Sequence, residues 1–210
     1  MTSQHNDAAV RLARLIWQPG LHMDDGWWRE LGLESWREPY QRHAICRAHV
    51  DRLLIARRGW PDTTTQDCTP PESDVAHAML RLLPSLRRVS LAYGLRALGC
   101  PDYLLLGTYR RALSSWLDAW QCDRLLLTRR EWPARSTFSP EQIVGAALAT
   151  AGACLDVAPE PLSVDMVTVG KAVRILLPPP VDTGQTPAID DIWPRLVALE
   201  KMLCMSSTLH

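Results

Sequence analysis

Apolar positions recur at helical spacing along most of the chain, and this pattern predicts a mostly α-helical protein. Near the start, Leu12, Ile16 and Trp17 share one face of a helix, and Pro19-Gly20 predicts where that helix ends. The same spacing predicts a second long helix from Ile45 to Ala56. Both segments have one apolar face, so each is expected to pack against a common core.

The helical pattern is strongest in the central block, residues 74–130. Within it, one helix is predicted from Asp102 through Leu117. A helix over 143–155 is rich in glycine and alanine, which would let a neighbouring helix approach closely. A last helix is predicted from about Asp191 to Met205. We therefore expect about eight helices.

Residues 164–177 give the one strand-like signal. The runs Val164–Val169 and Ala172–Leu177 are rich in β-branched residues, and Gly170-Lys171 between them could form the turn of a hairpin. A helix that buries Val169 and Val173 fits the same segment nearly as well. The fold class is therefore a compact, mostly α domain of about eight helices, with at most one short β-hairpin near 164–177.

Domain boundaries follow from the polar segments. Residues 62–73 contain four threonines and two prolines in a polar run, which predicts an exposed loop. We expect a single helical domain over 1–210, with a candidate N-terminal subdomain at 1–61 and a helical core at 74–210. A second loop is expected at 181–188, after three consecutive prolines.

Composition excludes several classes of protein. The chain has 210 residues, of which 47% are hydrophobic, so it can form a core. Its 23 basic and 23 acidic residues give no net charge, which argues against a dedicated nucleic-acid partner. No apolar run approaches the ~18 residues of a membrane span, so no direct membrane insertion is expected. Six scattered cysteines without a secretory signal favour a cytoplasmic protein with reduced thiols.

The sequence contains few of the motifs that mark a catalytic or metal-binding site. The chain lacks a Gly-x-Ser-x-Gly elbow, a His-Glu-x-x-His motif and a complete phosphate loop. His43, Cys46 and His49 lie at helical spacing, but a structural zinc site needs a second pair of ligands. We expect no catalytic residues, no metal and no cofactor. The alternative is a small α-helical cytoplasmic enzyme or ligand-binding domain that uses a cysteine or a histidine.

Arginine and tryptophan are the residue types that dominate protein interfaces. The chain has nine tryptophans and four Arg-Arg pairs, at 57/58, 87/88, 110/111 and 129/130. Adjacent tryptophans on a helix point about 100° apart, so one is expected in the core and the other near the surface. The predicted partner-binding residues are Trp27, Trp28, Arg29, Arg110, Arg111, Arg129 and Arg130.

The order of elements and a few motifs resemble the SctK family, which includes YscK and PscK. The N-terminal part has Trp17-x-Pro19-Gly20-Leu21-His22, followed by Trp28-Arg29 and Leu31. The second half has the helix around 142–148, a proline break, and an element that ends in Arg174-Ile175-Leu176-Leu177-Pro178. A short amphipathic helix from Leu196 to Met205 completes the pattern.

This resemblance implies a non-enzymatic part of the type III secretion injectisome. SctK-like proteins bridge SctQ pods of the cytoplasmic sorting platform to the forkhead-associated-like cytoplasmic domain of the inner-membrane ring protein SctD. The expected location is then the cytoplasm, at the inner-membrane base of the apparatus. A secretion chaperone is a further alternative, although chaperones of this kind are usually smaller and acidic.

Overall fold

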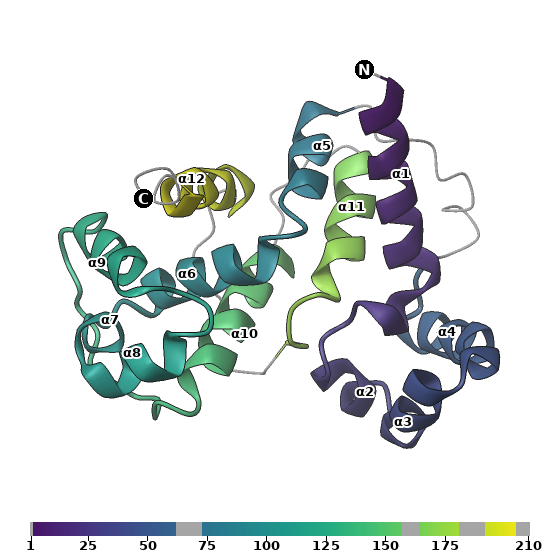
Figure 1. Ribbon diagram of the computed structural model, residues 1–210, viewed down its shortest axis with the longest axis horizontal. Coiled ribbons are helices and arrows are strands. Elements are labelled where there is room, and N and C mark those ends of the chain that lie inside the picture. The colour runs from purple at the N-terminus through teal and green to yellow at the C-terminus, as the bar shows by residue number, and fades with distance from the viewer. Residues whose placement is uncertain (1, 62–72, 157–163, 181–191, 205–210) are drawn as a thin grey trace. The chain divides into compact units, whose positions relative to one another are not determined.

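The computed structural model describes residues 2–61, 73–156, 164–180 and 192–204. These residues form twelve α-helices and one 3₁₀ helix, and they contain no strand (Figure 1). The predicted mostly helical fold is confirmed, while the expected eight helices are too few because several short helices were not anticipated. The predicted loop at 62–73, apart from Ser73, and the predicted loop at 181–188 lie outside the described residues.

The chain divides into two compact units, whose boundaries follow the three-dimensional packing and not the chain order. Unit 1 comprises Met1–Leu83 and Glu160–Pro179, and unit 2 comprises Pro84–Pro159 and Pro180–His210. Each unit therefore combines two stretches that are separated in the sequence. The predicted single domain with a subdomain at 1–61 stays a prediction.

Unit 1 is built on three helices that lie side by side, α1, α5 and α11 (Figure 1). Its elements are α1 (Thr2–Trp17), η1 (Pro19–Leu21), α2 (Gly26–Glu30), α3 (Glu34–Arg42), α4 (Ala44–Arg58), α5 (Asp74–Arg81) and α11 (Val164–Arg174). Leu12 and Ile16 of α1, Met79 of α5, and Val169 and Val173 of α11 are buried in its core. The apolar faces predicted from spacing thus meet one another.

Of the two alternatives for residues 164–177, the β-hairpin is wrong and the helix is correct. Residues Val164–Arg174 form α11, so Gly170 lies inside a helix instead of at a turn. The helix buries Val169, Ala172 and Val173 at helical spacing. Local β propensity is weak, and contacts with the rest of the core override it here.

Unit 2 is centred on two helices that lie against each other, α6 and α10 (Figure 1). Its elements are α6 (Leu86–Leu98), α7 (Asp102–Leu105), α8 (Gly107–Leu113), α9 (Ala119–Leu127), α10 (Ile143–Asp156) and α12 (Ile192–Cys204). Gly94 of α6 faces Ala147 of α10 so closely that an added Cβ would lie 1.9 Å from the Ala147 carbonyl oxygen. The small residues of 143–155 do therefore permit a close helix contact.

The helix predicted from Asp102 through Leu117 is in fact interrupted. Leu106 adopts an extended conformation between α7 and α8, and the Arg110 guanidinium donates a hydrogen bond from Nε to the Leu104 carbonyl at 2.6 Å. This bond satisfies a carbonyl that the interrupted helix would leave without a partner. A new helix, α9, then begins with a full capping box between Asp118 and Gln121.

Candidate functional site

The Trp17-x-Pro19-Gly20 signature forms the turn of η1 and is anchored by a buried carboxylate. Asp51 on α4 accepts a hydrogen bond from the Gly20 amide at 3.1 Å and from the Tyr40 hydroxyl at 3.0 Å. Burial raises the pKa of Asp51 above its usual value, although both hydrogen bonds act in the opposite direction. One side chain therefore ties η1 and α3 to α4.

Gly20 is required by packing. The ring of Tyr40 lies against its Cα, and a Cβ at this position would be 2.6 Å from the Tyr40 Cζ atom. Tyr40 itself is buried and packs against Trp28, with ring centroids 5.4 Å apart. The signature thus supports the interior of unit 1, because Gly20 contacts Tyr40, which in turn packs against Trp28.

The adjacent tryptophans of α2 are divided between the core and its edge, as predicted. Trp28 is only 3% exposed. Trp27 is half-buried, donates a hydrogen bond from Nε1 to the Leu177 carbonyl at 2.8 Å, and carries the Arg174 guanidinium 5.5 Å from its ring centroid. Both rings are therefore engaged within unit 1, and Trp28 has little surface to offer a partner.

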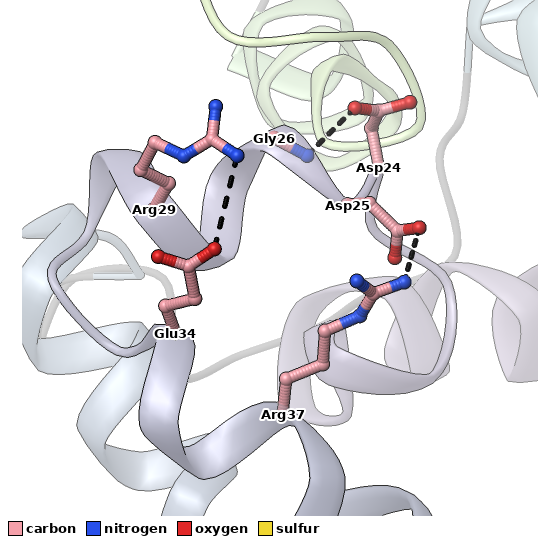
Figure 2. Close-up of polar contacts among 6 residues, drawn as sticks. All are labelled: Asp24, Asp25, Gly26, Arg29, Glu34 and Arg37. Carbon is pink, nitrogen blue, oxygen red and sulfur yellow. Dashed lines mark hydrogen bonds and ion pairs between the residues drawn. The ribbon is translucent and has the colours of Figure 1, made fainter.

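Figure 2 shows the polar contacts of the two aspartates that precede α2. Asp24 accepts a hydrogen bond from the Gly26 amide at 2.9 Å, which satisfies one free amide at the start of the helix. Asp25 forms an ion pair with Arg37, and the exposed Arg29 lies 3.7 Å from Glu34. Asp25 directly precedes the helix but makes no capping hydrogen bond with its side chain, so the carboxylate that accepts a helical amide is that of Asp24.

Two of the Arg-Arg pairs of unit 2, 110/111 and 129/130, each divide into one anchored and one exposed residue. Arg110 bonds to the Leu104 carbonyl and pairs with Asp123, and Arg129 donates to the Arg96 carbonyl and lies over Trp132. Their neighbours Arg111 and Arg130 are exposed. Consecutive residues on or near a helix point in different directions, so only one of each pair can reach the interior.

Apolar side chains are exposed in both units, and sequence reasoning did not single them out. In unit 1, Trp17 and Leu21 are 39% and 48% exposed and line a groove of about 760 Å³ that Arg47, Arg52 and Ile55 also line. We call this the η1–α4 groove. Patches of exposed apolar side chains are unusual on the surface of a monomer and often mark an interaction site.

Unit 2 also exposes large apolar side chains, at the end of α7 and on α9. Leu105, Leu106, Trp120 and Leu127 are exposed there, the last at 85%. Trp120 and Leu127 are seven residues apart, and so share the face of α9 that points away from the buried Cys122 and Leu125. We call Leu105, Leu106, Trp120 and Leu127 the α7–α9 surface. The i, i+7 spacing of Trp120 and Leu127 is the feature of the sequence that could have indicated it.

Comparison with protein families places these features in context. Residues 10–179 match the model of a family described as a type III secretion system subunit. The chain belongs to this family. A comparison with curated proteins and with solved structures finds no match. The matched range includes the signature, both tryptophans of α2 and the α7–α9 surface.

Other chemistry in this secretion subunit is sparse among the described residues. They hold no group of three His, Cys, Asp or Glu side chains placed to bind a metal, and none of their helices is long and apolar enough to cross a membrane. Burial raises the pKa of the Cys122 and Cys154 thiols, which lowers their thiolate fraction. Cys46 lies between His43 and His49 in sequence and is partly exposed.

Proposed function

We propose that the chain is a non-enzymatic adaptor of the type III secretion injectisome. In this role it links SctQ pods of the sorting platform to the cytoplasmic domain of SctD, at the cytoplasmic base of the inner membrane. The observation that carries the proposal is the presence of two compact units, each with its own exposed apolar surface. An adaptor needs two surfaces that can bind different proteins.

Residue type supports the use of both surfaces. The η1–α4 groove combines Trp17 with Arg47 and Arg52, and the α7–α9 surface combines Trp120 with Arg124, whose guanidinium lies 4.7 Å from the indole centroid. Tryptophan and arginine contribute large binding energies when a partner covers them. The resemblance to SctK-like proteins supports the identity of the two partners.

The candidate residues predicted from sequence differ in how directly they can contact a partner. Arg111 and Arg130 are exposed and available to a partner of unit 2, and Arg29 is exposed in unit 1. Arg110, Arg129 and Trp27 would act indirectly, because their side chains are engaged within their own units. Their contribution to partner binding stays a prediction.

A capture experiment with one variant for each surface tests the proposal. Leu21→Ser changes the η1–α4 groove, and Leu127→Ser together with Arg130→Glu changes unit 2; all three side chains are exposed, so folding should persist. SctQ and the SctD cytoplasmic domain from the same apparatus are the baits. Each variant should lose one bait and retain the other. Val164→Ser, at a position 81% exposed outside both surfaces, is the matched control.

Two outcomes would contradict this assignment. If both variants capture both baits as well as the control does, neither surface binds these partners. If each variant loses both baits, the partners share one surface and the chain is no bridge between them. Circular dichroism of each variant confirms that a lost interaction is not a lost fold.

A further inference from the structure

Unit 2 contains a pocket of about 610 Å³ that is lined by three arginines. Arg96 comes from α6, Arg129 follows α9, and Arg195 comes from α12. No aspartate or glutamate belongs to its lining among the described residues. Three cationic groups thus converge on one cavity without a carboxylate in its wall.

The arginines are close enough to act on one another. Burial lowers the pKa of the Arg96 guanidinium, and the positive charges of Arg129 and Arg195 lower it further. The buried Nε of Arg96 has no hydrogen-bond partner in the described part of the chain. Arg129 is held in place by its bond to the Arg96 carbonyl and by its contact with Trp132. Positive charge is therefore concentrated here, and the Nε of Arg96 is a donor that a ligand can use.

An oxyanion is the ligand that satisfies this arrangement. A guanidinium binds a carboxylate or phosphate through parallel N–H bonds, and such charge-assisted bonds are the strongest of the hydrogen bonds in proteins. A bound anion would also remove the repulsion among the three arginines. The Tyr93 hydroxyl, which already interacts with Arg195 and Cys154, adds a polar group to the same wall.

The rest of the wall indicates what the anion is attached to. Ala97, Ala198, Leu199 and Met202 line the same cavity, so part of it suits an apolar group. Its volume is in the range of about 300–1,000 Å³ that is common for sites of organic ligands. A bare inorganic ion would leave this apolar part uncovered, whereas an acidic residue beside an apolar one would fill both parts.

We propose that this pocket binds a carboxylate of an acidic peptide segment that also inserts an apolar side chain. The inference deepens the proposed function, and rests on it, in that the segment would belong to a partner subunit. The pocket is separate from the residues that define the α7–α9 surface, so it adds a second contact to unit 2.

Titration of the full chain with defined probes tests the pocket without any partner subunit. The probes are a capped tetrapeptide Leu-Glu-Leu-Glu, its Leu-Gln-Leu-Gln counterpart, and inorganic phosphate, with binding followed by calorimetry. The acidic peptide should bind at least about tenfold more tightly than either other probe, because the neutral peptide lacks the carboxylates that form charge-assisted bonds with the arginines and phosphate lacks the leucines that fill the apolar part. Arg195→Gln and Arg96→Gln should each weaken it by a similar factor.

Arg135→Gln is the control, because Arg135 is exposed in unit 2 and outside the pocket lining. Equal binding of the acidic and neutral peptides, or pocket variants that bind as well as this control, would overturn the proposal. Phosphate binding as tight as peptide binding would overturn the peptide as ligand and leave a small-anion site. Arg195 is exposed, so its variant provides the result if Arg96→Gln does not fold. Because partners are absent, failure of the adaptor function would appear only in the capture experiment.

Discussion

Replacement of Gly94 by alanine tests how closely α6 and α10 pack. The new Cβ would lie 1.9 Å from the Ala147 carbonyl oxygen, and the shortest ordinary contact at such a position is 3.4 Å. The two helices must therefore separate by about 1.5 Å, which loosens contacts along their whole interface. The obstacle is backbone, so no side-chain rotation can relieve it.

The expected magnitude follows from two opposing effects. Overpacking a core costs about 1–3 kcal/mol, and this clash with backbone belongs at or above the upper end. Alanine regains about 1 kcal/mol of helix propensity over glycine. The net loss for unit 2 is then about 2 kcal/mol, which corresponds to a roughly thirtyfold faster exchange of its most protected amides.

Gly145→Ala supplies the matched control in the partner helix. Its Cβ would meet nothing within 4 Å, so only the gain in propensity remains and the amides of α10 should exchange more slowly. Hydrogen exchange of α6 and α10 distinguishes the two variants because it reports on unit 2 alone. If Gly94→Ala protects these amides as well as Gly145→Ala does, the close helix contact is wrong. A second change, Ala147→Gly, should not rescue Gly94→Ala.

Two further predictions concern unit 1. Burial raises the pKa of Asp51 above 3.8, so the folded state holds its proton longer, and the stability of the wild type relative to Asp51→Asn should fall as pH rises from 3.8. Chemical denaturation across that range checks this, and an advantage that grows with pH would contradict it. Trp27→Phe removes the bond to the Leu177 carbonyl and should cost about 0.5–1.5 kcal/mol by thermal denaturation, whereas the exposed Trp36→Phe should cost much less. Equal losses would show that the bond to Leu177 contributes little.

Local signals predicted the ends of the longer helices. Gly59 takes the left-handed conformation, with φ of +65°, and ends α4 just after the predicted helix Ile45 to Ala56, and Pro19 begins the turn after α1. Helical periodicity also placed Leu12 and Ile16 on the buried face of α1, although Trp17, predicted on the same face, is 39% exposed. These features depend on residues within one or two turns of each other, so the sequence alone contains the information needed to place them.

The sequence analysis did not predict the features that depend on contacts between residues far apart in the chain. The α11 segment has strand-like composition, and only burial against α1 and α5 makes it a helix. Nothing near Arg110 in sequence reveals that it pairs with Asp123, so it could not be distinguished from Arg111. The arginine pocket likewise joins residues from three separate helices or their ends. Such sites become visible only once the chain is folded.

The signature at residues 17–22 combines both kinds of role within six residues. Pro19 is buried and Gly20 contacts Tyr40 and Asp51, while Trp17 and Leu21 on either side are exposed in the η1–α4 groove. The η1 turn therefore contributes both to the core of unit 1 and to the exposed η1–α4 groove. A Gly20 variant would disturb both, and a loss of partner binding there would not identify a contact. Leu21→Ser changes only the displayed side chain, which is why it can separate recognition from folding.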